Sequence, residues 1–146
     1  MTDKVEFQRR GPKQFRLFTD QCCHILEDIG FSLSKEDGQF PDLGINVCTA
    51  AKNKAGKQFL FLFRGSWAGT QPGLLRTDTT KKALYNAYAL AAEKVGIPFV
   101  IMTSHDVSAR SGSSKMIAAA RRHGVLHDVI VTTNTKDIER LNLMAG

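Results

Sequence analysis

Apolar residues recur along the chain with two different periods, which predict an alternation of helices and strands. Between residues 15 and 29 the apolar positions return every three or four residues, which is typical of an amphipathic helix that starts near Pro12. Residues 31–35 alternate between apolar and polar, as a half-buried strand does, and a turn signal follows at Asp37-Gly38.

The stretch FLFLFRGSW, residues 59–67, is apolar for five residues and then changes abruptly to a cation, a glycine and a hydroxyl. Such a run predicts a strand over 57–63 that is buried on both faces. A second strand over 43–50 and a polar hairpin loop over 52–56 are expected to precede it. The chain therefore leaves the core of the predicted sheet at Arg64.

The rest of the chain continues the alternation. It predicts, in order, a glycine-containing loop over 65–76, a helix from Thr77 or Asp78 to Gly96, a strand over 97–103, a polar loop over 104–114, a helix over 115–123, a strand within 125–132 and a helix over 136–143. Three meandering strands followed by a crossover helix and a further strand predict an α/β fold with a mixed central sheet flanked by helices. The length fits a single domain over residues 1–146.

Composition narrows the class of protein. A hydrophobic content of 42% and a charged content of 23% are ordinary for a globular chain, and no apolar run approaches the roughly 18 residues of a membrane span. The polar start lacks a secretory signal, so we expect a cytoplasmic protein without a membrane partner. Cys22, Cys23 and Cys48 form an odd set without a repeated spacing, which favours core packing over disulfides or a metal site.

The net charge of +6 comes from one segment of the chain. Between residues 52 and 82 there are seven basic residues and one acid, whereas the remaining residues carry thirteen of each. An excess of positive charge around one strand and its exits suits a polyanion such as nucleic acid. The alternative is a solvated basic face that keeps the protein soluble.

Several short motifs follow the basic strand in a specific order. They are Arg64-Gly65-Ser66 at the strand end, then Pro72-Gly73-Leu74, Thr77-Asp78-Thr79 and Lys81-Lys82-Ala83, and finally Thr103-Ser104-His105. With the predicted order of elements, the chain resembles the restriction-endonuclease-like, or PD-(D/E)XK, nuclease superfamily, and within it small bacterial restriction-like proteins. The resemblance covers about residues 11–132 and implies an αβββαβ core, here with an additional C-terminal helix, strand and helix.

The resemblance implies a metal site that this sequence does not reproduce. In such nucleases an acid near the second strand, and an acid and a lysine on the third, hold magnesium and position the attacking water. Here the third-strand acid falls on Leu62 and the lysine on Arg64, while the second-strand acid falls on Asp42 or Asn46. Leucine cannot ligate a metal and arginine is never a base. We therefore expect a catalytically degenerate member without a metal cofactor.

A phosphate can still be bound by the guanidinium of Arg64, the backbone of Gly65 and the hydroxyl of Ser66. The residues expected to contact nucleic acid are Lys52, Lys54, Arg64, Ser66, Trp67, Arg76, Lys81 and Lys82. Trp67 could stack on a base or cover the sheet edge. Arg64 could instead pair with Asp42. His105 and His127 lie near strand ends without a serine or cysteine partner placed by spacing, so we expect both to be structural.

These observations predict a domain that binds nucleic acid, in particular double-stranded DNA. By resemblance it acts in a restriction or phage-defence setting, as a homodimer or with a companion restriction subunit. One alternative is an active, magnesium-dependent DNA endonuclease with a relocated acidic site that includes Asp42. Acids that could contribute to such a site are Glu27, Glu36, Asp37 and Asp78. A second alternative is a non-enzymatic assembly module that binds a protein partner.

Overall fold

The structure, a computed structural model, describes residues 2–65, 77–107 and 109–146, with side chains from residue 16 onward. In chain order the elements are α1 (Thr2–Ile29), β1 (Ser32–Ser34), the short 3-10 helices η1 (Glu36–Gly38) and η2 (Pro41–Leu43), β2 (Thr49–Lys52), β3 (Gln58–Arg64), α2 (Thr77–Ala92), β4 (Phe99–Thr103), α3 (Gly112–Arg122), β5 (Asp128–Val131) and α4 (Thr135–Ala145). The predicted order of helices and strands is confirmed, with the two 3-10 helices added.

The five strands form one mixed sheet in the order β1-β2-β3-β4-β5. The first three strands pair antiparallel, whereas β3, β4 and β5 run parallel. Arg64 lies opposite Thr103, and Thr103 lies opposite Val131. The ends of the three parallel strands therefore share one side of the sheet, which we call the carboxyl edge.

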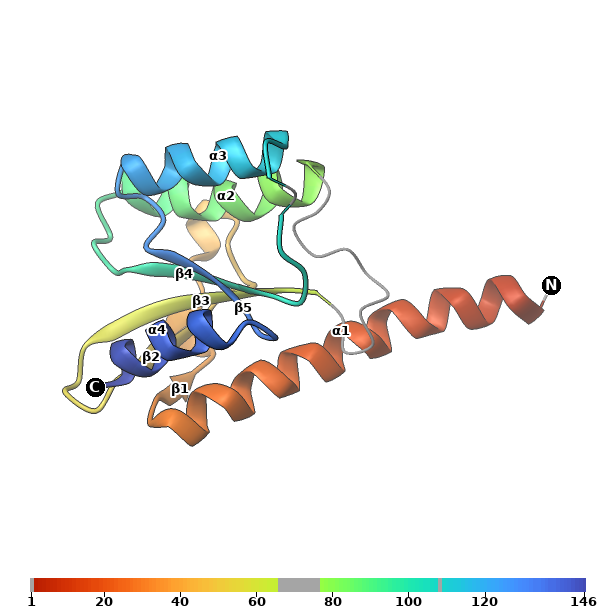
Figure 1. The fold of residues 1–146 in the computed structure, drawn as a ribbon, viewed down its shortest axis with the longest axis horizontal. Coiled ribbons are helices and arrows are strands. Elements are labelled where there is room, and N and C mark those ends of the chain that lie inside the picture. The colour runs from red at the N-terminus through yellow and green to blue at the C-terminus, as the bar shows by residue number, and fades with distance from the viewer. Residues whose placement is uncertain (1, 66–76, 108) are drawn as a thin grey trace.

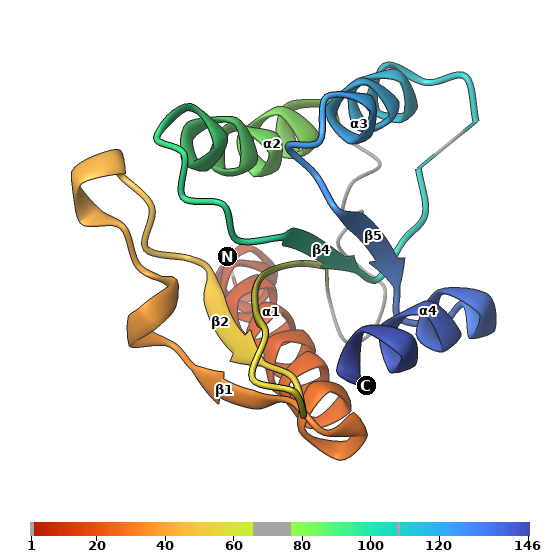
Figure 2. The ribbon, with the colours of Figure 1, turned by 90° about the vertical axis from the view of Figure 1, so that its left-hand side faces the viewer.

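Helices cover both faces of the sheet (Figures 1 and 2). In Figure 1, α2 and α3 lie above the sheet and α1 and α4 lie below it. Leu60 and Leu62 of β3 belong to the core beneath α2 and α3, whereas Phe59, Phe61 and Phe63 belong to the core against α1 and α4. Since successive strand residues point to opposite faces, an uninterrupted apolar run is what a strand between two helical layers requires.

Helix α1 starts at Thr2, ten residues earlier than the expected start at Pro12. The added segment is rich in Glu, Gln, Arg and Lys, which are good helix formers, so local propensity favours the longer helix. The predicted buried stripe is confirmed at Phe18, Cys22 and Leu26, each fully buried. No helix in the described part of the chain combines the length and apolar character needed to cross a membrane.

The second strand begins later than expected, at Thr49 rather than near Leu43. Phe40 and Ile45 exchange backbone hydrogen bonds of 2.6 and 3.1 Å, which close a tight turn over η2. Gly44 has a φ of +70°, a conformation that glycine adopts without a steric penalty. Pro41 and Gly44 thus produce a turn in a segment whose apolar residues alone favour a strand.

Candidate nucleic-acid interface

Arg64 is the last residue of β3 and is half-buried at the carboxyl edge of the sheet. It follows Leu62 by two positions, so its side chain leaves the sheet on the face covered by α2 and α3. Its Nη1 donates a hydrogen bond to the carbonyl oxygen of Phe63 at 3.0 Å. The ion pairs among the described residues join Arg121 and Arg140 to Asp128, and Arg140 to Asp137. The alternative pair between Arg64 and Asp42 is therefore not formed.

The described residues around Arg64 do not neutralise its charge. Burial lowers the pKa of the Arg64 guanidinium from its ordinary value, because a buried site disfavours the charged form. The neighbouring thiol is Cys48, whose burial raises its pKa to about 12, so this thiol is uncharged at neutral pH. Arg64 is thus a partly desolvated cation without a carboxylate partner in the described structure, an arrangement that an external anion would stabilise.

The chain packs closely where it leaves β3. A Cβ atom at Gly65 would collide with the side chain of Ser104, so this position accepts no side chain. The backbone nitrogen of Ser104 donates to the carbonyl oxygen of Arg64 at 3.3 Å. Ser104 Oγ also lies 2.8 Å from His105 Nδ1. The expectation that His105 lacks a serine partner is therefore wrong, because its neighbour in the sequence supplies one beside Arg64.

Two helices begin at the same edge of the sheet. Helix α2 follows β3 and helix α3 follows β4, and both start near the strand ends (Figure 1). A Cβ at Gly112 would lie 3.8 Å from Thr77 Oγ1, so the two helix starts are adjacent. The hydroxyls of Thr80 and Ser113 join them through a buried hydrogen bond of 2.9 Å. Helix N-termini present backbone N–H groups and positive partial charge, so this edge favours anions.

The positions where the resemblance would place metal ligands do not form a cluster of ligands in the described structure. Leu62 is completely buried in the core, while Asp42 lies exposed in η2 and Asn46 is exposed before β2. Among the described residues, no group of three or more histidine, cysteine or acidic side chains is arranged to hold a metal ion. The described part of the carboxyl edge thus offers cations and helix N-termini for binding.

The predicted nucleic-acid contacts separate into two groups. Lys81 and Lys82 are exposed in the first turns of α2, near the carboxyl edge. Lys52 pairs with Gln58 at the opposite end of β3, about 20 Å from Arg64 along the strand. Lys54 lies in the hairpin beyond it, where its backbone nitrogen donates to Ala145 at 3.2 Å.

The structure therefore does not bring Lys52 and Lys54 together with Arg64, because an antiparallel hairpin returns its loop to the far end of the strand. The sequence alone could have predicted this separation, since the lysine-containing loop precedes the strand and Arg64 ends it. Ser66, Trp67 and Arg76 lie outside the described residues.

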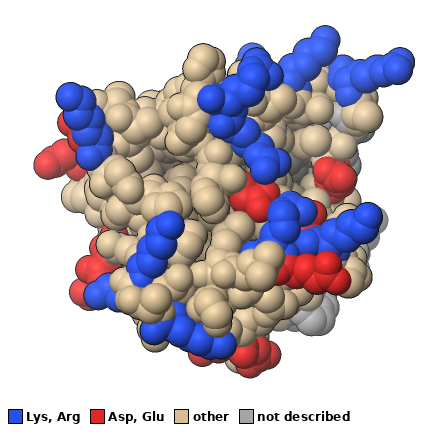
Figure 3. Space-filling view, turned by 60° about the vertical axis from the view of Figure 1, so that its left-hand side comes forward, with Lys and Arg blue, Asp and Glu red and all other residues tan. Residues whose placement is uncertain are grey.

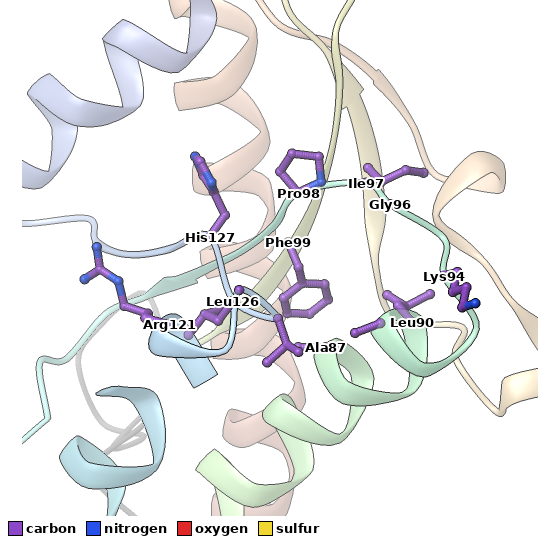
Figure 4. Close-up of a pocket in the computed structure, with 13 residues that line it drawn as sticks. Ala87, Leu90, Lys94, Gly96, Ile97, Pro98, Phe99, Arg121, Leu126 and His127 are labelled. Atoms are coloured by element: carbon purple, nitrogen blue, oxygen red, sulfur yellow. The ribbon is translucent and has the colours of Figure 1, made fainter. Parts of the chain in front are cut away.

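The described residues also form a cleft of about 550 Å³ at the other end of the parallel strands (Figure 4). Its floor is apolar and includes Leu90, Phe99 and Leu126, while Lys94 and Arg121 stand at its sides. The two cations lie where α2 and α3 end, and positive charge there complements the helix dipoles. Because helix C-termini repel anions, this cleft favours an anion less than the carboxyl edge does.

Neither the protein-family models, nor the curated proteins, nor the solved structures contain a match to the chain. The assignment of a function therefore depends on the arrangement of the residues themselves.

Proposed function

We propose that the chain is a restriction-endonuclease-like domain that binds double-stranded DNA through its phosphates and does not cut it. The observation that carries this proposal is Arg64, a partly desolvated guanidinium without a carboxylate partner in the described structure. It lies at the edge where three parallel strands end, and the adjacent N-termini of α2 and α3 face the same side of the sheet. Guanidinium groups and helix N-terminal N–H groups both donate charge-assisted hydrogen bonds to the phosphate oxygens of a nucleic acid.

The topology supports the same proposal. A helix, three antiparallel strands, a second helix and a parallel fourth strand follow one another in the order expected of a restriction-endonuclease-like core. In such a core the third-strand acid would stand at Leu62, which is apolar and fully buried. The absence of a ligand atom at that position favours binding without cleavage.

The first experiment measures binding and cleavage together. Purified protein in stoichiometric excess is incubated at low salt with labelled duplex DNA, single-stranded DNA and RNA, first with magnesium and then with manganese. We expect a shifted, uncut duplex. Arg64→Ala should weaken binding about 10- to 100-fold, since hydrogen bonds to charged groups are the strong ones. Lys136→Ala, on the exposed surface of α4, is the control and should bind as the wild type does.

The same assay separates the two competing functions. Cut products that disappear in Asp42→Ala would show an active metal nuclease with a relocated site and would overturn the proposal. Failure to shift any nucleic acid at low salt would instead favour an assembly module that binds a protein. Arg64→Lys retains the charge without the planar fork, so intermediate binding by this variant would identify a two-point contact to phosphate.

A further inference from the structure

Helices α2 and α3 pack side by side (Figures 1 and 2). Residues of both helices line a groove of about 290 Å³. The lining residues are Lys81, Leu84, Tyr85, Tyr88, Met116 and Ala119. The groove starts within the first turns of α2, close to the carboxyl edge. It is thus an extension of the proposed phosphate-binding edge along the helical layer.

Two aromatic rings in this groove are open to solvent. Tyr85 is 56% exposed and Tyr88 is 42% exposed, and the other large hydrophobic residues of comparable exposure in the described chain, Val47 and Leu143, lie on different elements. Single exposed hydrophobic residues are ordinary, whereas neighbouring exposed residues in a groove indicate a contact surface.

The ring of Tyr85 is held in place before any ligand arrives. Its hydroxyl donates a hydrogen bond of 3.0 Å to the carbonyl oxygen of Leu43 in η2. An aromatic ring that is fixed and still half open to water loses little conformational freedom on stacking. The groove therefore offers a preorganised aromatic surface.

The charge around the rings selects the kind of partner. Together α2 and α3 carry five basic residues, of which Arg121 pairs with Asp128 at the far end of α3, and a single acid, Asp78, which lies in the first turn where a helix favours an acid. Lys81 lines the groove itself. Lysines interleaved with exposed aromatic rings are typical of surfaces that bind single-stranded nucleic acid by backbone contacts and base stacking.

We infer that the α2–α3 groove binds an unpaired strand of nucleic acid next to the duplex held at Arg64, with bases stacked on Tyr85 and Tyr88. Bases within a duplex already stack on one another, so only unpaired bases expose faces to the two rings. This inference rests on the proposed function, and it narrows the substrate to a junction between duplex and single strand.

The test compares a blunt duplex with the same duplex carrying a single-stranded tail of about ten nucleotides, a length within the usual site size for such surfaces. Wild-type protein should bind the tailed duplex at least about fivefold more tightly, because stacking of even one base gives this gain. Tyr88→Ala should lose most of the gain without a change in blunt-duplex affinity. Tyr88→Phe should keep it, and Leu143→Ala on α4 is the matched control. Arg64→Ala should weaken both DNAs by the same factor.

A fluorescent base analogue in the tail gives a second readout, since stacking on a tyrosine quenches it. Equal affinity for blunt and tailed duplex, or a gain that survives in Tyr88→Ala, would overturn the inference and leave the proposed function standing. Binding of the tailed DNA without binding of the blunt duplex would overturn the proposed binding of duplex DNA and leave the groove as a site for unpaired bases. Circular dichroism of Tyr88→Ala checks the fold, which an exposed substitution to a good helix former should preserve.

Discussion

The two helical layers of this molecule share a structural task and differ in charge. Each layer covers a different face of the sheet, and each buries its own core of aliphatic or aromatic residues. Helices α2 and α3 carry five basic residues and one acid, whereas α1 and α4 carry seven of each. Figure 3 shows basic side chains projecting at the top of the molecule, where α2 and α3 lie, and basic and acidic side chains intermingled below.

The layers also differ in how their charges are used. On the side of α4, Arg140 donates to the buried carboxylate of Asp128 at 2.9 and 3.2 Å and pairs with Asp137 at 2.8 Å. On the side of α2 and α3, Arg121 lies 3.8 Å from the same Asp128 carboxylate, whereas Arg64 donates only to a backbone carbonyl among the described residues. Folding needs no uncompensated positive charge, and an excess on one layer is what the proposed binding of a polyanion requires.

The largest expected effect comes from reversing the charge of the basic layer. Lys81→Glu combined with Lys82→Glu should weaken duplex binding about 100-fold at low salt, because each lost phosphate contact forfeits roughly a factor of ten in counterion release. The matched double variant on the balanced layer is Arg16→Glu with Lys136→Glu, both at exposed positions. Equal weakening by the two doubles, measured by fluorescence anisotropy, would remove the distinction between the layers.

The second prediction contrasts Arg140, which pairs with carboxylates, and Arg64, which has no carboxylate partner among the described residues. Arg140→Ala should lower the free energy of unfolding by about 2 kcal/mol, because it leaves Asp128 buried without its main partner; the 42% exposure of Arg140 keeps the value below that of a fully buried pair. Arg64→Ala should cost less than about 0.5 kcal/mol, since it removes a desolvated cation that gains little from its surroundings. Urea unfolding at neutral pH measures both. A larger loss in Arg64→Ala than in Arg140→Ala would show that Arg64 has a structural role.

The smallest expected effect is a loss of stability at high pH, and it should be the same for the two cores. Cys48 lies in the core beneath α2 and α3, Cys22 lies in the core against α1 and α4, and burial raises the pKa of both thiols. A raised pKa in the folded state means that the unfolded chain loses these protons first, so stability falls as the pH rises above about 9.

Each thiol should cost about 1.4 kcal/mol between pH 8 and pH 10. Urea unfolding with reductant at the two pH values measures this loss in the wild type, in Cys48→Ala and in Cys22→Ala. Each variant should lose about that much less than the wild type over the interval. If either variant loses as much stability between pH 8 and pH 10 as the wild type does, the thiol that it lacks is exposed or titrates normally.

The order of elements could be predicted because it depends on local patterns that tertiary contacts did not oppose. The apolar run at residues 59–63 and the helical stripe at Phe18, Cys22 and Leu26 are such patterns. Asn86 shows where they fail. A polar residue favours the exposed face of a helix, yet Asn86 is only 5% exposed, and its amide is satisfied by donating to the carbonyl oxygens of Lys82 and Ala83.

The site was predictable only in part. Arg64 could be singled out because a cation follows an apolar strand, but the contact between Gly65 and Ser104 depends on the register of two strands that are 35 residues apart. The pairing of Thr80 with Ser113 likewise depends on how two helices pack. The grouping of Lys52 and Lys54 with Arg64 treated closeness in sequence as closeness in space.

The central claim is that Arg64 and the basic layer bind phosphates, and the salt dependence of duplex binding tests it most directly. The dissociation constant is measured from about 50 to 200 mM salt for the wild type and for Arg64→Ala. We predict a slope of log K against log salt of about −3 or steeper for the wild type, and one shallower by about 0.9 for Arg64→Ala, as the loss of one phosphate contact requires. A wild-type slope near zero, or one that Arg64→Ala leaves unchanged, would contradict the account.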